Sequence, residues 1–108
     1  MENNLTIESI KNILSKTFSN EPIYKAILFG SYAKGTADEK SDIDLVIDSH
    51  GTLLGLNFFG LLDKVKNSLG KEIDLIEISE IEKNSKIEQS IMSEGVIIYD
   101  RTQWKSTS

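Results

Sequence analysis

The chain has 108 residues, of which 39% are hydrophobic and 27% charged, and 17 acidic against 12 basic residues leave a net charge of −5. A domain with this balance has no broad attraction for a phosphate backbone, so direct nucleic-acid binding is not expected. The absence of cysteine excludes disulfides and thiolate metal sites. The polar N-terminus and the lack of a long apolar run argue against a signal peptide and a membrane span, so we expect one domain in the reducing cytoplasm.

The N-terminal third of the chain predicts a helix, a strand and a tight turn. Apolar residues at helical spacing predict an amphipathic helix over residues 6–19. These residues are Ile7, Ile10, Leu14 and Phe18. After Pro22, residues 24–29 form a short apolar run typical of a strand, and residues 31–35 are typical of a turn that enters a short helix. Residues 37–41 are polar and predict a loop.

The remaining elements alternate between strand and helix. Residues 42–48, 72–78 and 96–99 are expected to be strands. Between the first two of these strands lies a helical pattern that ends at Gly70. Its apolar positions are Phe58, Leu61, Leu62, Val65 and Leu69. Within residues 79–94, the second half is expected to be helical.

Strands that alternate with helices indicate an α/β (α+β) fold around a mixed sheet of about four strands. We expect helices to pack mainly on one face of that sheet, which leaves the other face available for a site. Residues 1–100 are expected to form the domain, and residues 101–108 a polar C-terminal tail. In that tail, Trp104 is either an anchor for a partner or a residue without contacts. The aromatic residues expected in or near the core are Phe58, Phe59 and Tyr99.

Two aspartates in one predicted strand indicate a metal site. Asp42 and Asp44 are two residues apart, so their side chains point to the same face of the strand. Adjacent carboxylates repel each other unless a counter-charge lies between them. Hard carboxylate oxygens suit Mg²⁺, which binds one or two carboxylates together with substrate phosphates. Taken alone, the same pattern would also fit a solvated entry to a strand.

Asp74 is the third candidate ligand, because it interrupts a run that otherwise reads as a core strand. If its strand lies beside the strand of Asp44, the three aspartates could hold two Mg²⁺ ions ~4 Å apart, as in enzymes of in-line phosphoryl displacement. Asp74 could also accept the proton of an attacking hydroxyl. The alternative is an edge-strand residue that points to water.

Gly30, Ser31 and Lys34 are the candidate nucleotide-binding residues. Glycine lets a backbone approach a ligand closely, and the helix N-terminus that follows presents free N–H groups to an anion. The Ser31 hydroxyl can donate one more hydrogen bond, and Lys34 could add a positive charge near the phosphates. The alternatives are an ordinary strand-to-helix turn and a solvated lysine.

Taken together, Gly30-Ser31 and the Asp42-x-Asp44 pattern resemble the signature of the DNA polymerase beta superfamily of nucleotidyltransferases. The chain as a whole resembles the minimal nucleotidyltransferase (MNT) group, whose members have about this length. The resemblance implies a polymerase-beta-like fold, Mg²⁺ on Asp42, Asp44 and Asp74, and a triphosphate on Gly30 and Ser31. Lys34 departs from the arginine that relatives often carry, and lysine lacks the bidentate fork of arginine.

The same resemblance implies a partner. MNT proteins commonly pair with HEPN-domain proteins, many of them RNase toxins, and some MNT antitoxins transfer AMP from ATP onto a tyrosine of the toxin. An antitoxin that neutralises its partner by binding alone, without catalysis, is the alternative. A transferase that modifies small molecules fits less well, because such enzymes usually carry an additional acceptor domain.

Overall fold

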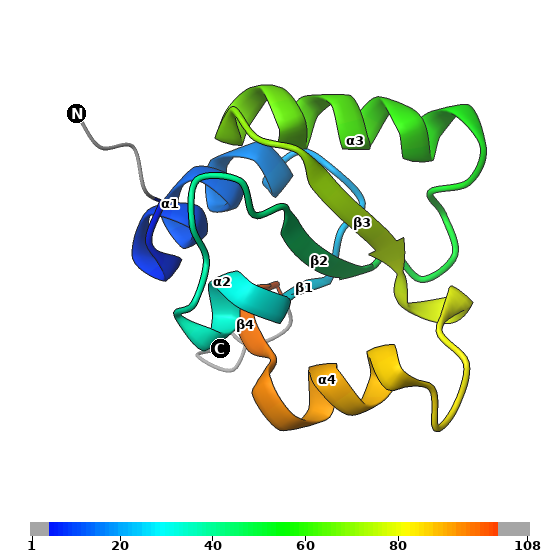
Figure 1. The fold of residues 1–108 in the computed structure, drawn as a ribbon. Coiled ribbons are helices and arrows are strands. Elements are labelled where there is room, and N and C mark those ends of the chain that lie inside the picture. Colours follow the sequence, from blue (N-terminus) through cyan, green and yellow to red (C-terminus); the bar gives the residue numbers. More distant parts are fainter. Residues whose placement is uncertain (1–4, 102–108) are drawn as a thin grey trace, which may run out of the picture.

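The computed structural model describes residues 5–101, which form one four-stranded sheet with helices on both sides (Figure 1). In chain order the elements are α1 (Ile7–Phe18), β1 (Lys25–Phe29), α2 (Gly30–Lys34), β2 (Ile43–Asp48), α3 (Leu56–Leu69), β3 (Ile73–Glu77), the 3₁₀ turn η1 (Ile78–Glu80), α4 (Lys86–Glu94) and β4 (Val96–Asp100). Within these residues, no helix is long and apolar enough to cross a membrane. Trp104 lies outside the described residues.

The sheet is mixed, with strand order β3-β2-β1-β4. β1 pairs antiparallel with both β2 and β4, whereas β2 and β3 are parallel and joined through α3. The predicted mixed sheet of about four strands is therefore confirmed. In the described part of the chain, β3 and β4 form the two edges of the sheet, so β3, which carries Asp74, has a strand on one side only.

The longer helices α1 and α3 pack against each other over one face of the sheet (Figure 1). Thr6 caps α1, because its side chain accepts a hydrogen bond from the Ser9 N–H while the Ser9 side chain bonds back to the Thr6 backbone. The amphipathic pattern of α1 then places Ile10, Leu14 and Phe18 in the core. This packing fixes the sheet that carries the candidate site.

α3 buries one stripe and leaves an aromatic residue outside. Leu61, Val65 and Leu69 face the sheet, and Gly70 ends the helix in the left-handed conformation. Phe58 packs against the core, as does Tyr99 on β4. Phe59 is 61% exposed, so its expected place in or near the core is wrong. Phe59 lies outside the stripe formed by Phe58, Leu61, Val65 and Leu69, which recur at helical spacing and face the sheet.

The two shorter helices lie across the other face, where α2 contacts β1, β2 and α4 (Figure 1). Each strand differs from the prediction by one residue at one or both ends, and two of these differences have a clear cause. Asp42 precedes β2 rather than lying in it, because parallel pairing starts where the Ile43 N–H bonds to the Glu72 carbonyl. Ile78 belongs to η1 rather than β3, because the Glu77 carboxylate accepts the Ser79 N–H and turns the chain there.

Candidate active site

The structure places Asp44 and Asp74 directly opposite each other on neighbouring strands. The parallel register of β2 and β3 pairs Ile43 with Ile73 and Asp44 with Asp74. Asp44 is half-buried and Asp74 is exposed. Their side chains leave the sheet on the face opposite the α1–α3 layer, because the flanking Ile43 and Leu45 point into the core. Two carboxylates thus meet on the face that carries only the shorter helices.

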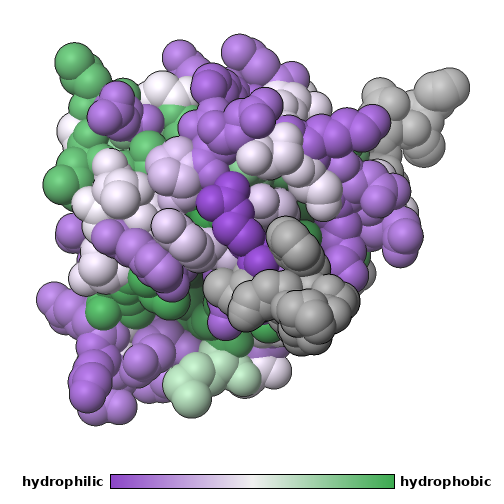
Figure 2. Space-filling model, turned by 180° about the vertical axis from the view of Figure 1, so that it is seen from behind, coloured by the Kyte–Doolittle hydropathy of each residue, from purple (hydrophilic) through white to green (hydrophobic). Residues whose placement is uncertain are grey.

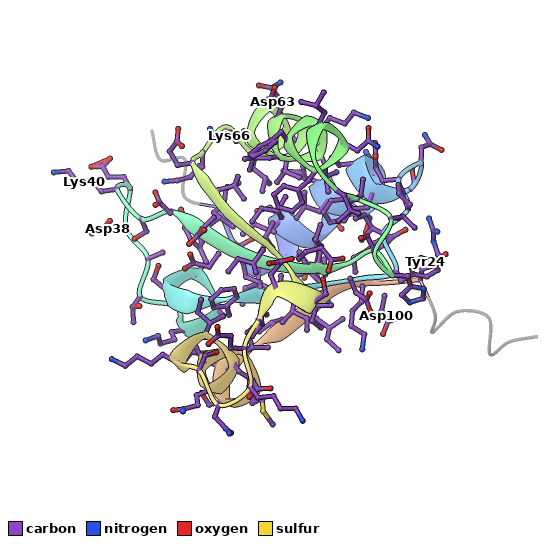
Figure 3. All side chains as sticks on the ribbon, turned by 90° about the vertical axis from the view of Figure 1, so that its right-hand side faces the viewer. Tyr24, Asp38, Lys40, Asp63, Lys66 and Asp100 are labelled. Atoms are coloured by element: carbon purple, nitrogen blue, oxygen red, sulfur yellow. The ribbon has the colours of Figure 1, made fainter. Side chains whose placement is uncertain are left out.

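Asp42 flanks this pair from the turn before β2. Asp38 organises that turn: its carboxylate accepts hydrogen bonds from the Lys40 N–H at 2.9 Å and from the Ser41 hydroxyl at 3.2 Å. The Asp38 N–H in turn donates to the Ser41 hydroxyl oxygen at 2.9 Å. Figure 3 shows Asp38 and Lys40 at one end of the molecule, opposite Tyr24. The turn thereby holds Asp42, which is exposed, at the entrance to β2.

The nearby carboxylates of Asp74 and Asp42 affect the pKa of Asp44. Burial is the largest cause that raises the pKa of Asp44, followed by the negative charges of Asp74 and Asp42 and by a hydrogen bond with the Asp74 carboxyl group. Together these causes raise the pKa to about 6. The ionised form of Asp44 is therefore disfavoured as the site stands, and a cation placed between the carboxylates would favour it.

Gly30 closes the site from the side of β1. Its φ is +74°, a left-handed conformation that a residue with a side chain rarely adopts. A β-carbon on Gly30 would stand 2.1 Å from Oδ2 of Asp44, far inside contact distance. The turn that leads into α2 and the carboxylate of Asp44 are thus in direct contact, as the predicted pairing of Gly30-Ser31 with the aspartates requires.

The other two candidate nucleotide-binding residues lie on α2. Ser31 is half-buried in the first turn, and its carbonyl accepts the Gly35 N–H that ends the helix. Lys34 is the last residue of α2 and is exposed. Tyr32 between them is buried in the core, with the Lys71 ammonium 5.7 Å from the centre of its ring. The structure thus brings Ser31 to the Gly30–Asp44 contact and puts Lys34 one helical turn away.

The chemistry of the donor set fits Mg²⁺, since all three candidates are carboxylates and their mutual repulsion already raises the pKa of Asp44. As the side chains lie, no three acidic or histidine groups within residues 5–101 converge closely enough to enclose a metal ion. The Asp74 carboxyl group already meets Asp44, and both Asp42 and Asp74 are exposed, so an ion can reach them from solvent.

Sequence reasoning missed the positive charges beside Asp42. Asp42 lines a polar cleft of about 530 Å³ together with Lys40, Lys66 and Lys71. Lys71 donates to the Glu39 carbonyl at 2.9 Å, and Lys66 lies 3.4 Å from Glu72. In Figure 3, Lys40 and Lys66 come from the loop before β2 and from α3. Only the fold brings these lysines together, so no local sequence signal could have indicated them.

Comparison with known proteins places the chain in a family. Residues 8–103 match the family described as polymerase beta, nucleotidyltransferase. The chain belongs to the polymerase beta nucleotidyltransferase family. A family member from Thermococcus cleftensis, named protein adenylyltransferase MntA, is 30% identical over 98 residues, which are 87% of this chain and 97% of that protein. The fold class predicted from the sequence is thereby confirmed.

Solved structures with a similar fold include two toxin-antitoxin complexes. A toxin-antitoxin crystal structure with AMP-PNP superposes with a TM-score of 0.69 at 24% identity, and covers 90% of this chain and 78% of its own. A structure of the tri-AMPylated Shewanella oneidensis HEPN toxin in complex with MNT antitoxin has a TM-score of 0.64 at 20% identity, with 94% and 79% covered. At these identities the likeness is one of fold.

Proposed function

We propose that this chain is a Mg²⁺-dependent protein adenylyltransferase that transfers AMP from ATP onto a tyrosine of a HEPN-domain toxin and thereby acts as its antitoxin. The observation that carries the proposal is the meeting of Asp44 with Asp74 across β2 and β3, against the backbone of Gly30. Membership of the nucleotidyltransferase family supports the reaction class. The names of the similar proteins support the toxin partner and the adenylyl group.

In the proposed reaction the acceptor oxygen forms a bond to the α-phosphorus of ATP. The bond from that phosphorus to the bridging oxygen breaks, and pyrophosphate leaves with the electron pair. The hydroxyl proton passes to Asp74, which is exposed and therefore accessible to an acceptor. The Gly30-Ser31 backbone and the Ser31 hydroxyl would hold the triphosphate, with Lys34 as an outlying positive charge.

Asp42, Asp44 and Asp74 would hold two Mg²⁺ ions. When bound, Mg²⁺ neutralises the triphosphate and polarises the oxygens at the reacting phosphorus. The fold of this chain positions the three aspartates. The strand pairing places Asp44 beside Asp74, and the Asp38–Ser41 turn holds Asp42 at the start of β2. The close contact of Gly30 with Asp44 keeps triphosphate and metal ligands in one place.

The decisive experiment is a transfer assay. The chain is incubated with α-labelled ATP, Mg²⁺ and the protein encoded beside it, which we propose to be the HEPN-domain toxin, and label on that protein is measured. We expect label with the wild type and none with Asp42→Asn or after chelation with EDTA. The control variant Asp63→Asn changes an exposed aspartate of α3 remote from the site and is expected to transfer normally.

Two results would contradict the proposal. If Asp42→Asn transferred AMP at the wild-type rate, the acidic cluster would not be the catalytic site. If no nucleotide labelled the partner, yet the chain still suppressed the partner's RNase activity at equal stoichiometry, neutralisation would occur by binding alone.

A further inference from the structure

Among residues 5–101, β3 is an edge strand that pairs with β2 on one side and with no strand on the other. The Ile43 N–H bonds to the Glu72 carbonyl, and in a parallel ladder this fixes which residues of β3 bond to β2. Asp74 and Ile76 direct their N–H and carbonyl groups inward to β2. Ile73 and Leu75 therefore direct theirs outward, away from the sheet. Such a row of outward groups is a template for one more strand.

A groove runs beside this edge on the side of α3. It has a volume of about 320 Å³, and its apolar lining includes Leu53, Leu54, Phe58, Phe59, Leu75 and Ile76. Leu54 is 65% exposed, Phe59 61% and the neighbouring Leu56 87%. Figure 2 shows hydrophobic surface at the upper left, where the N-terminal end of α3 lies. Large apolar side chains gathered at one place on a surface indicate a binding site.

The edge, the groove and the reaction site are continuous. Asp74 directs its backbone groups inward to β2, and its exposed carboxylate lies beside Asp44 on the face of the sheet that carries the candidate site. Leu75, the next residue, lines the groove on the opposite face. A strand added along this edge would therefore place one side chain at Asp74 and a neighbouring side chain over the groove.

We propose that β3 binds the acceptor protein as an added strand: an extended segment of the acceptor pairs with the outward groups of Ile73 and Leu75. Its hydroxyl-bearing residue lies over Asp74 and its apolar residue fills the groove at Phe58 and Phe59. This inference rests on the proposed adenylyl transfer and adds the mode by which the acceptor is held. Strand addition is a general mode of peptide recognition, in which backbone bonds supply affinity and pockets supply specificity.

The geometry dictates a spacing in the acceptor. Successive residues of a strand point to opposite faces of the sheet, so Asp74 lies on one face and Leu75, which lines the groove together with side chains of α3, lies on the other. The sequence numbers of the modified residue and of the apolar anchor in the acceptor therefore differ by an odd number. Glu80 lines the groove and is exposed, and the exposed Asp74 lies on the other face of the same strand, so both carboxylates favour basic residues elsewhere in the acceptor segment.

Amide hydrogen exchange tests the added strand directly. The proposed HEPN-domain partner is added without ATP, so that no transfer takes place, and exchange of each backbone amide is measured. We expect the amides of Ile73 and Leu75 to exchange at least about tenfold more slowly in the complex. The amides of Asp74 and Ile76 already bond to β2, so their protection serves as the internal reference. Unchanged exchange at Ile73 and Leu75 would overturn the proposal.

Groove variants test the apolar anchor. Leu54→Ser and Phe59→Ser change exposed side chains, so the fold is expected to survive. We expect each to raise the KM for the HEPN-domain acceptor about tenfold while the affinity for ATP is unchanged. The matched control is Met92→Ser, a 78% exposed apolar residue on α4. Equal KM values for groove variants and control would overturn the proposal.

The two proposals fail in different ways. If wild-type protein transfers no AMP but the outward amides are protected by the partner, the adenylyl transfer fails and the docking mode stands. If transfer occurs and the outward amides exchange as in the free chain, the docking mode fails alone. Protection of these amides in the chain by itself, together with dimer formation, would assign the edge to a second copy and overturn the acceptor strand.

Discussion

Gly30 and Asp44 are in contact through backbone and carboxylate, although 13 positions separate them in the sequence: a β-carbon on Gly30 would stand 2.1 Å from Oδ2 of Asp44 and 3.0 Å from its Cγ. Gly30 also adopts a φ of +74°. The conformation and the space each require glycine at this position. The turn that would bind the triphosphate and the carboxylate that would bind the metal therefore pack so closely that only glycine fits between them.

Gly30→Ala is expected to displace Asp44 and to abolish adenylyl transfer. The positive φ alone costs a residue with a side chain about 1–3 kcal/mol, and the contact with Asp44 adds to that. Gly51→Ala is the matched control, because Gly51 has a φ of +77° but open space around its Cα. Urea denaturation and Mg²⁺ titration should show destabilisation of both variants and loss of Mg²⁺ affinity only in Gly30→Ala. Normal Mg²⁺ affinity in Gly30→Ala would refute the contact as a determinant of the site.

Asp44→Asn is expected to stabilise the metal-free fold while it abolishes transfer. The pKa of Asp44 is raised to about 6 by burial and by the charges of Asp74 and Asp42. Folding therefore loses stability as the pH rises from the unfolded value near 4 through 6 and regains it on acidification. Asn carries no charge, so the variant avoids this loss; after discount for solvent screening we expect a gain of about 1 kcal/mol at pH 8.

Urea denaturation with EDTA at pH 8 and at pH 4 measures this effect. The stability gain of Asp44→Asn should appear at pH 8 and vanish at pH 4, whereas Asp63→Asn on the exposed side of α3 should show no such dependence. Addition of Mg²⁺ should stabilise the wild type and leave Asp44→Asn unchanged. A variant that is less stable than the wild type at pH 8 without metal would contradict the electrostatic account.

Local sequence patterns predicted the main helices and strands and named the residues of the candidate site. The spacing of Ile10, Leu14 and Phe18 indicates α1, and alternation of apolar residues with Asp44 indicates β2. Asp44 and Asp74 could be named as partners only on condition that their strands are neighbours, which the parallel pairing of β2 and β3 fulfils. The periodicity of a strand predicts which face of the sheet a side chain occupies. The residue that lies opposite it is known only once the pairing of the strands is known.

Contacts between distant segments were not predictable from the sequence. The close approach of Gly30 to Asp44 depends on how β1 and β2 pair and where α2 begins. Phe59 was expected in or near the core, because hydrophobicity alone does not show which side of α3 faces the sheet. The edge position of β3 follows from strand order, which no local pattern encodes.

Glu77 is expected to stabilise the fold near neutral pH and to lose this effect in acid. Its carboxylate is 5% exposed and accepts the Ser49 N–H at 2.8 Å, the Ser49 hydroxyl at 2.6 Å and two bonds from Ser79. Burial alone would raise the pKa of Glu77, but these hydrogen bonds outweigh it and lower the pKa below its ordinary value. The contribution is thus complete above pH 4.5 and is lost as the pH falls through the lower folded value.

Glu77→Gln measures that contribution. We expect a loss of about 1.5–3 kcal/mol at pH 7, because the bonds to a charged acceptor are weakened. The exposed Glu82→Gln is the control and should change stability little. In urea denaturation from pH 7 to pH 3, the difference between Glu77→Gln and wild type should narrow below pH 4.5. A difference that stays constant over this range would mean that the charge of Glu77 is not what the serines stabilise.

Lys34 is expected to contribute to ATP binding through its charge. It lies at the end of α2, one turn from Ser31, and is exposed, so its effect on the phosphates would be screened by salt. Lys34→Ala should raise the KM for ATP about three- to tenfold at low ionic strength and less at high ionic strength, while Lys34→Arg keeps the wild-type value. Lys83→Ala, which removes an exposed lysine between η1 and α4, is the control. If both alanine variants gave the same KM at low salt, Lys34 would be a solvated charge of the surface, and the triphosphate would be held by Gly30, Ser31 and the metal ligands without it.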